Sequence, residues 1–282
     1  MQQVKTMSTL ESEATKALLF AFSSVPHLRK GCVLKGGNAL KIAYNSPRAS
    51  VDLDFTLANA FTTDADAHES LLKDFCDFLS RGLSRAETRY PFHLRITRAV
   101  VRPQGQDPRT FPGFEIKIGF ADRRREYRPG EIDRYFRHNT LKIDISLNEV
   151  ICENAPFQLG EFVLEIATLN DILAEKLRAI LQQIPRNRYR PGDFYDIWYF
   201  YTHHANSLDV NKISTYLQEK SENRAHQELH VSKAAFENPE ILRRGAVQFT
   251  HLGDTIAGRM PSFEEASAAV LQLVSRLTIP EH

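Results

Sequence analysis

The sequence has few cysteines, no long apolar run and almost no net charge, and each of these shortages excludes a class of protein. The three cysteines, Cys32, Cys76 and Cys152, have no metal-binding spacing, so we expect no zinc site and a reducing, cytoplasmic location. No apolar run is long enough to span a membrane, and no basic start followed by an apolar core marks a secretory signal. We therefore expect no membrane partner. A net charge of +1 does not by itself indicate nucleic-acid binding.

The composition is typical of a soluble enzyme. The chain has 282 residues, of which 42% are hydrophobic and 25% are charged. This length is sufficient for one large domain or two small domains with ample cores. The sequence contains no internal repeat and no low-complexity linker.

Residues 48–57 are the most informative stretch. Their alternation places Asp52 and Asp54 on one face of a strand and apolar residues on the other. Two carboxylates at this spacing lie roughly 7 Å apart and can share divalent ions, which prefer oxygen ligands. Taken alone, such a pair faces solvent more often than it serves catalysis.

A double glycine precedes this strand. An apolar run covers residues 32–34 and is followed by Lys35, after which Gly36, Gly37 and Asn38 lead into a helix-forming stretch that contains Lys41. This order predicts a strand, a tight turn and a helix N-terminus, whose free backbone N–H groups suit a phosphate. A glycine pair alone is a weak signal, because most such pairs only turn the chain.

Together, Gly36, Gly37, Asp52 and Asp54 resemble the signature of nucleotidyltransferases of the DNA polymerase β type. Within that superfamily, Lys-Gly-Gly-x-Ala-Leu and Arg-x-Ser-x-Asp-Leu-Asp-Phe are most similar to the AbiEii/AbiGii toxin family of type IV toxin–antitoxin and abortive-infection systems. The resemblance spans residues 31–200. It implies an α+β fold, in which a polymerase β-like domain with a mixed sheet is followed by a C-terminal helical region.

A third motif, Ala-Glu-Lys-Leu, lies on a predicted helix that Thr168 caps. Lys176 falls within the apolar arc of this helix, whereas Glu175 and Arg178 fall outside it, and we expect them to face solvent. An inward lysine needs an anionic partner, such as a triphosphate or a carboxylate. The alternative is a lysine whose stem covers apolar surface while its ammonium reaches water.

A fourth motif, Arg-Pro-Gly-Asp-Phe-Tyr-Asp, begins another predicted helix and brings Asp193 and Asp196 one turn apart. The resembled family has an Arg-x-Lys/Arg-Asp-x-x-Asp motif here, but Gly192 stands where the basic residue is expected. The structural alternatives are that Asp193 is the N-cap and that Asp196 complements the helix dipole.

A third carboxylate comes from the alternating run 141–147, which places Lys142, Asp144 and Ser146 on one face. Polymerase β-type enzymes use such a carboxylate to deprotonate the attacking hydroxyl or to complete the metal shell. We therefore assign Asp144 this role by resemblance. A face exposed to solvent is an equally good interpretation of the alternation.

Arginines concentrate between residues 95 and 138, and this run is a candidate RNA-binding segment with Arg123, Arg124 and Arg125 at its centre. The other arginines are Arg95, Arg98, Arg102, Arg109, Arg128, Arg134 and Arg137. Tyr127, Tyr135 and Phe136 are interleaved and suit stacking on unpaired bases, although partial burial is the more ordinary fate of such side chains. Acidic residues dilute the run.

The remaining pattern predicts helices in the first quarter of the chain, then strands, and then helices from residue 169 to the end. The expected segments are helices 8–25 and 66–83, a strand–turn–helix–strand unit at 31–57, and strands 92–101, 114–120, 139–147 and 160–167. We expect residues 1–168 to form the nucleotidyltransferase domain. Residues 169–282 would form a helical domain that completes the active-site cleft.

The resemblance also implies a reaction. Asp52 and Asp54 would hold Mg²⁺, and NMP would pass from an NTP to an RNA acceptor, in some relatives the 3′ end of tRNA, with release of pyrophosphate. Gly36, Gly37, Asn38 and Ser50 would bind the nucleotide. Lys35 and Lys176 would neutralise the triphosphate, and Asp193 or Asp196 would orient Lys176 or the base.

Such a toxin implies a cognate antitoxin. Two other functions fit the same residues. One is an enzyme that modifies a protein hydroxyl, and the other is a catalytically silent nucleotide- or RNA-binding module.

Overall fold

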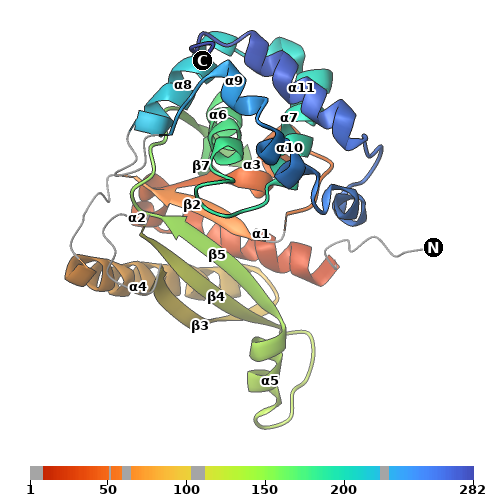
Figure 1. Ribbon diagram of the computed structural model, residues 1–282. Coiled ribbons are helices and arrows are strands. Elements are labelled where there is room, and N and C mark those ends of the chain that lie inside the picture. The colour runs from red at the N-terminus through yellow and green to blue at the C-terminus, as the bar shows by residue number, and fades with distance from the viewer. Residues whose placement is uncertain (1–8, 51, 59–64, 103–111, 223–228) are drawn as a thin grey trace. The chain divides into compact units, whose positions relative to one another are not determined.

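The computed structural model of the protein describes residues 9–50, 52–58, 65–102, 112–222 and 229–282 (Figure 1). Tertiary contacts divide the chain into two compact units, and the division falls inside a helix. We call residues 7–39 and 50–167 the sheet unit, and residues 1–6, 40–49 and 168–282 the helical unit. The domain boundary expected after residue 168 stays a prediction.

The sheet unit contains a seven-stranded mixed sheet with the strand order β3-β4-β5-β2-β1-β7-β6. The strands are β1 (Cys32–Lys35), β2 (Leu53–Leu57), β3 (Phe92–Arg102), β4 (Gly113–Asp122), β5 (Thr140–Ser146), β6 (Asn154–Leu159) and β7 (Phe162–Ala167). Strand β2 pairs in parallel with β5 and antiparallel with β1, and β1 pairs in parallel with β7. The predicted mixed sheet and its strands are therefore confirmed.

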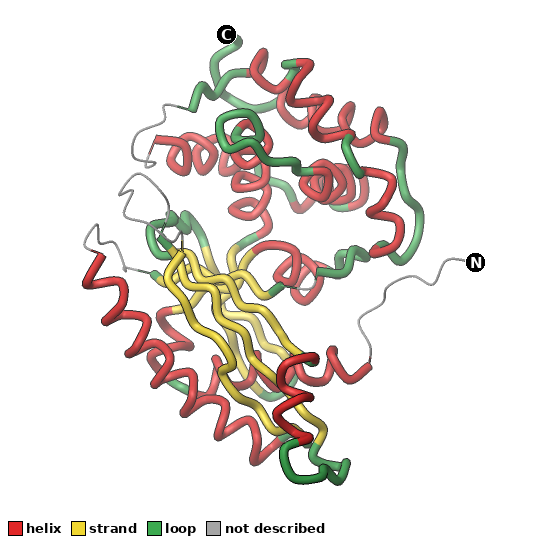
Figure 2. The backbone as a smooth tube through the Cα atoms, turned by 60° about the horizontal axis from the view of Figure 1, so that its bottom comes forward, coloured by secondary structure: helices red, strands yellow, loops and turns green. Residues whose placement is uncertain are grey.

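Two long helices cover one face of this sheet (Figure 2), and a short helix lies on the other face, where the side chain of Phe136 contacts Gly119. The helices of the sheet unit are α1 (Thr9–Ser24), α2 (Pro26–Gly31), α4 (Ala65–Arg89) and α5 (Glu131–His138), together with the start of α3 (Gly36–Tyr44). Helices α1 and α4 contact each other, and the Phe22 ring of α1 stacks on the Phe55 ring of β2 at a centroid distance of 4.2 Å. Each such buried aromatic ring contributes roughly 1.5–3 kcal/mol. This packing holds the apolar side of the strands against the helices.

Three elements of the sheet unit were not predicted from the sequence pattern: α2, α5 and β6. Strand β6 lies at the sheet edge, contains Pro156 and is largely exposed, so it shows no buried alternation. Helix α5 is only eight residues long and buries Phe136 alone. Short elements with little buried surface give a weak hydrophobic periodicity.

The helical unit is built around α6. Its described elements are all helices, as predicted for the chain from residue 169 onward. Its elements are α6 (Leu169–Leu181), α7 (Pro191–His203), η1 (Ala205–Ser207), α8 (Val210–Glu222), α9 (Lys233–Phe236), α10 (Pro239–Ala246), η2 (Phe249–Thr255) and α11 (Phe263–Ser275). The hydroxyl of Thr168 accepts a hydrogen bond from the Asp171 N–H, which confirms the predicted cap. Helix α6 contacts α7, α8, α9 and α10, and this central position buries nearly all of its side chains.

Burial on every side of α6 corrects one expectation. Arg178 was expected to face solvent, but it is 3% exposed and its Nε donates to Glu175 at 2.9 Å. On another side, the carboxylate of Asp171 pairs with the ammonium of Lys220 from α8 at 3.0 Å, and both side chains are buried. An apolar arc identifies the most hydrophobic side of a helix but does not show that the other sides are exposed.

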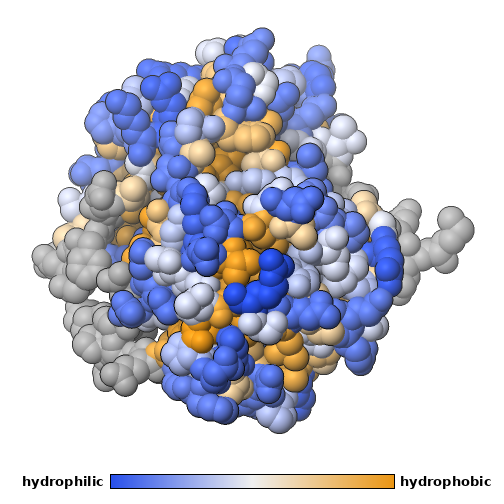
Figure 3. Space-filling model, turned by 90° about the horizontal axis from the view of Figure 1, so that it is seen from above, coloured by the Kyte–Doolittle hydropathy of each residue, from blue (hydrophilic) through white to orange (hydrophobic). Residues whose placement is uncertain are grey.

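Hydrophilic side chains cover most of the face seen in Figure 3, with hydrophobic side chains visible between them. Ile184 and Tyr189 are the exposed large hydrophobic residues of the described part of the chain. Within the same residues, no helix has the length and apolar character needed to cross a membrane.

Candidate functional site

A row of charged side chains crosses four neighbouring strands of the sheet unit. The register sets Lys35 of β1 opposite Asp54 of β2, Asp54 opposite Asp144 of β5, and Asp144 opposite Glu115 of β4. Partners in register point to the same face of a sheet, as do residues two positions apart. The structure therefore places Asp54 and Asp144 on one face of the sheet, and Asp52, just before β2, shares a lysine partner with Asp144.

Gly36 allows this row to meet the start of α3. Strand β1 ends at Lys35 and α3 begins at Gly36, whose φ of +67° favours glycine. A Cβ at this position would lie 2.6 Å from Oδ2 of Asp54. Glycine is required here for two reasons. Its left-handed backbone disfavours a side chain, and the Asp54 carboxylate occupies the place that a Cβ would take.

Asn38 holds the segment that leads into β2. Its buried amide donates to the carbonyl oxygen of Asp52 at 2.7 Å and to that of Ser50 at 3.3 Å. These bonds fix the backbone on either side of position 51, which itself lies outside the described residues. A nucleotide-binding role for Asn38 and Ser50 stays a prediction.

Lys35 has partners within the protein. Its ammonium donates to the hydroxyl of Ser146 at 2.9 Å and forms an ion pair with Glu149, whose side chain is 6% exposed. The sequence motifs assigned no role to Glu149, which follows β5 and carries no local signal. The pair neutralises Lys35 beside the carboxylate row.

The electrostatics of the row raise the proton affinity of Asp54. Burial raises the pKa of the half-buried Asp54 carboxyl to about 6. Neighbouring carboxylates, chiefly Asp144 and Asp52, act in the same direction, and the positive charge of Lys35 acts against them. A fraction of Asp54 is therefore protonated just below neutral pH.

Lys142 lies between two of the carboxylates. Its ammonium donates to Oδ2 of Asp144 at 2.7 Å and to Oδ2 of Asp52 at 3.3 Å. Burial disfavours the charged lysine, but Asp144 and Asp52 outweigh this effect, so the pKa of Lys142 is raised. The alternation of run 141–147 already placed Lys142 on the face of Asp144, and that was the available signal for it.

The donor set of this row fits a hard divalent cation in kind. Carboxylate oxygens on adjoining strands are the ligands that Mg²⁺ prefers. In the arrangement described here, no three His, Cys, Asp or Glu side chains of the described residues converge closely enough to hold an ion. The ammonium of Lys142 occupies part of the space between the carboxylates.

A second cluster lies in the helical unit and joins α6 to α7. Nζ of Lys176 lies 2.7 Å from Oδ1 of Asp193 and 2.6 Å from Oδ2 of Asp196. Arg48 contacts both oxygens of Asp196, with its Nε 2.7 Å from Oδ1. The predicted inward orientation of Lys176 is confirmed, since the residue is 6% exposed. Lys176, Arg48, Asp193 and Asp196 thus form a nearly neutral network, and Nε of the more exposed Arg190 lies 4.0 Å from Oδ2 of Asp193 at its edge.

The network decides between alternatives that the sequence left open. The N-cap of α7 is Arg190, so Asp193 lies inside the first turn and is not the cap. Asp196 is fully buried, and the attraction of Arg48 and Lys176 outweighs burial and lowers its pKa. The motifs missed Arg48 as a member, although it belongs to the quoted stretch 48–57.

The predicted RNA-binding arginines stand on the sheet unit and have local partners. Arg123 donates to the carbonyl oxygen of Glu87 at 2.6 Å, Arg124 pairs with Asp122, and Arg125 pairs with Glu131. Their side chains remain exposed, whereas Phe136 is buried, so burial rather than base stacking is the outcome for this ring. Arg109 lies outside the described residues.

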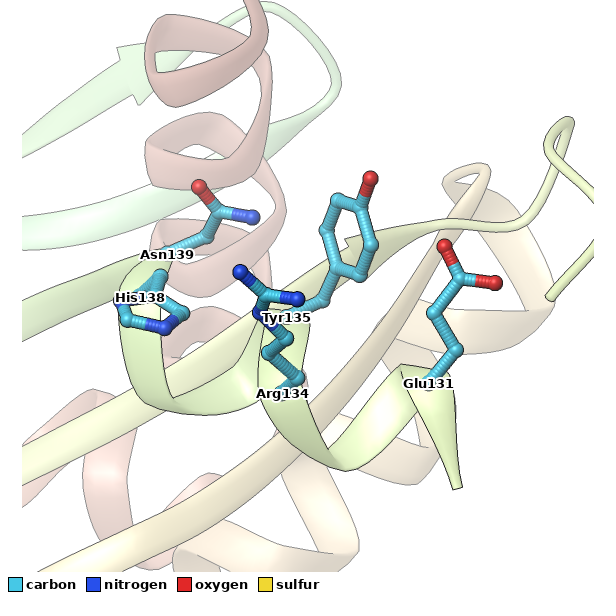
Figure 4. A pocket seen from close by; sticks show the side chains of 5 residues that line it. All are labelled: Glu131, Arg134, Tyr135, His138 and Asn139. Carbon is cyan, nitrogen blue, oxygen red and sulfur yellow. The ribbon is translucent and has the colours of Figure 1, made fainter. Parts of the chain in front are cut away.

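A shallow hollow of about 350 Å³ lies on α5, close to these arginines (Figure 4). It is lined by Glu131, Arg134, Tyr135, His138 and Asn139. Helix α5 leads into the first residue of β5, whereas Asp144 is the fifth. The hollow is therefore separate from the carboxylate row.

Comparisons with known proteins agree with this geometry. Residues 17–269 match the profile of a family described as nucleotidyl transferase AbiEii toxin, Type IV TA system. Among solved structures, the nucleotidyltransferase toxin MenT4 of Mycobacterium tuberculosis is similar with a TM-score of 0.53 at 17% identity, over 95% of this chain and 83% of that chain. JHP933 from Helicobacter pylori gives 0.53 at 15%, over 96% and 92%. Curated protein sequences gave no match.

Replacing Gly36→Ala should displace the Asp54 carboxylate. We expect a loss of stability of roughly 1–2 kcal/mol from the left-handed backbone alone, and a further loss from the contact with Asp54. The matched control is Gly160→Ala, which has a φ of +62° and nothing within 4 Å of its Cβ. Urea unfolding of both variants measures the difference, and equal losses would contradict the required close approach.

Replacing Asp54→Asn should stabilise the protein at neutral pH in EDTA. The folded-state pKa lies above the ordinary value of 3.8, so the stabilising effect of the protonated form is present below that value and is lost as the pH rises through about 6. Ionised Asp54 then costs up to about 3 kcal/mol, at about 1.4 kcal/mol per pKa unit. Asparagine carries no charge and avoids this cost.

The measurement is urea unfolding of wild type and Asp54→Asn at pH 7.5 and pH 4. The gain should be large at pH 7.5 and should shrink towards pH 4. Asp74→Asn, an exposed position on α4, is the control and should show no comparable gain. A gain that does not depend on pH would refute the charge explanation.

Proposed function

Because this chain belongs to the AbiEii family of nucleotidyltransferase toxins of type IV toxin–antitoxin systems, we propose that it transfers NMP from an NTP to an RNA hydroxyl, at the 3′ end of tRNA. The family implies an NTP substrate and a cognate antitoxin. The observation that carries the proposal is the row of Asp52, Asp54 and Asp144 beside the glycine that begins α3. A binding module without turnover has no need of this concentration of carboxylates.

The sheet unit supplies the groups at the reacting phosphate. Asp52 and Asp54 would hold the divalent ion that enzymes of this kind generally use, which we propose is Mg²⁺. When bound, this ion neutralises phosphate charge and orients the triphosphate for in-line attack. Backbone N–H groups at Gly36 and Gly37 bind phosphate oxygens, as a helix N-terminus favours.

The chemical step is a displacement at the α-phosphorus. The acceptor oxygen forms a bond to phosphorus while the bond to the bridging oxygen of pyrophosphate breaks. A carboxylate oxygen of Asp144 accepts the proton of the attacking hydroxyl. Positioning of the two reactants supplies much of the rate enhancement.

The helical unit supplies a lysine ammonium whose position is fixed by ion pairs. Asp193 and Asp196 hold the ammonium of Lys176 by ion pairs at 2.7 and 2.6 Å. Their attraction outweighs burial and raises the pKa of Lys176, so the lysine stays charged throughout the physiological range. We assign Lys176 the neutralisation of the triphosphate, and Asp193 and Asp196 its orientation.

The acceptor is proposed to be RNA because exposed arginines and aromatic rings gather around α5. Arg125 lies over the Tyr135 ring at 4.6 Å, and the hollow of Figure 4 adjoins it. Such groups contact phosphates and stack on unpaired bases. A tRNA acceptor places the activity in the cytoplasm, and an added nucleotide would block aminoacylation.

The proposal is tested by incubating the purified protein with bacterial RNA, Mg²⁺ and each α-³²P-labelled NTP in turn. A tRNA-sized band should be labelled by wild type, and labelling should fall at least about 10³-fold in Asp52→Asn,Asp54→Asn. Lys176→Met should also lose most labelling. Label in a protein band would instead indicate modification of a protein hydroxyl, and no label with intact RNA binding would indicate a silent binding module.

The arginine segment is tested by replacing Arg123, Arg124 and Arg125 with glutamine. RNA binding should weaken, and the slope of log K against log[salt] should flatten by about 0.7 for each phosphate of a single strand that the variant no longer neutralises. The control replaces Arg243, Arg259 and Arg276, which are exposed on the helical unit, with the same change in net charge. Filter binding at several salt concentrations measures the affinity and the salt slope of each variant. If the variant of the arginine segment has the same slope as wild type, the segment does not take part in RNA binding.

A further inference from the structure

The position of Lys142 has a consequence for metal binding. Its ammonium contacts Asp52 and Asp144 through Oδ2 of each. Lys142 and Asp144 belong to β5, whereas Asp52 directly precedes β2, so the lysine connects carboxylates of two segments. An ammonium and a divalent cation both bind the lone pairs of carboxylate oxygens, so they compete for the same atoms.

The contacts of Lys142 are of a kind that a cation can displace. The side chain of Lys142 is 34% exposed, and those of Asp52 and Asp144 are 43% and 39% exposed. Ion pairs at this level of exposure contribute little free energy, because water screens them and two side chains must be held in place. By contrast, Lys35 and Lys176 pair with carboxylates that are almost completely buried, and these pairs are not readily exchanged.

We infer that Lys142 is an internal competitor for the divalent cation: its ammonium must leave Asp52, a proposed ligand, before the cation binds there, and must leave Asp144 before that carboxylate can act as the base. The inference rests on the proposed function, since it concerns the same carboxylates. In the absence of the cation, Lys142 lowers the repulsion between the two aspartates. When the cation arrives, its charge replaces that of the lysine.

Competition of this kind couples the cation to the nucleotide. Mg²⁺ is commonly bound by one or two carboxylates together with substrate phosphates. A triphosphate supplies further oxygen ligands and negative charge, and both favour release of the ammonium. Lys142 therefore weakens binding of the cation alone more than binding of the cation with NTP.

The test is the affinity for Mn²⁺ without nucleotide, measured by isothermal titration calorimetry at 150 mM KCl. Lys142→Met should lower Kd by roughly 3- to 10-fold, the release of one or two exposed ion pairs. Lys142→Arg keeps the charge and should stay near the wild-type Kd. Adding a non-hydrolysable NTP analogue should reduce the difference between Lys142→Met and wild type.

The matched control is Lys117→Met. Lys117 of β4 stands directly opposite Lys142 in the sheet and forms no ion pair within the described part of the chain. The two substitutions change the net charge equally, so a purely long-range effect would lower both values of Kd alike. If Lys142→Met does not fold, Lys142→Gln makes the same comparison.

An unchanged or raised Kd in Lys142→Met would overturn the inference, because it would mean that the lysine is neutral to the site or prepares it. Absence of Mn²⁺ binding in both proteins would overturn it as well. The labelling assay on wild type distinguishes this failure from failure of the proposed function. If wild type labels RNA and Lys142→Met binds Mn²⁺ no more tightly than wild type, only the role of Lys142 is refuted. If wild type labels nothing and Lys142→Met binds Mn²⁺ more tightly than wild type, only the proposed transferase activity is refuted.

Discussion

Repulsion between carboxylates on neighbouring strands is the constraint on which the candidate site of the sheet unit depends. The parallel pairing of β2 with β5 sets Asp54 opposite Asp144, and Asp52 stands two positions away. Burial and this crowding raise the pKa of Asp54 to about 6. The lysines respond to the same constraint, with Lys35 beside the row and Lys142 between two of its members. Carboxylates that repel one another in the absence of a cation are suited to bind a divalent cation, because its charge removes the repulsion.

The helical unit solves the opposite problem, that of holding a cation inside the protein. Lys176 is buried, yet two aspartates and Arg48 close a network in which each charge has a partner. Asp196 is the common partner of Arg48 and Lys176, so removing its carboxylate would leave Arg48 without this ion pair, and breaking a buried pair typically costs about 3–5 kcal/mol. The pair of Lys220 and Asp171 shows the same principle elsewhere in α6. The charged groups of the helical unit therefore form buried ion pairs, whereas the ion pairs of Lys142 in the sheet unit are exposed and can be displaced.

Much of the architecture follows from local patterns. Alternation at period two marks β2 and β5, and the apolar arc of α6 together with Thr168 marks the start of the central helix. Edge strand β6 buries too little surface to produce such a pattern, and α5 is a single short helix of eight residues within a highly charged segment. Arg178 shows the limit of the arc, because a helix enclosed on all sides buries residues that lie outside it.

The sequence by itself determined which residue types are available for chemistry: the aspartates in and just before β2, the glycines that begin α3, the lysine of α6 and the aspartates of α7. Spacing along one element decides which of these residues share a face. Only the tertiary structure decided the partners. Strand register set Lys142 between Asp52 and Asp144, and folding brought Arg48 to Asp196, 148 residues away. Contacts between distant segments depend on packing and register, which no local period encodes.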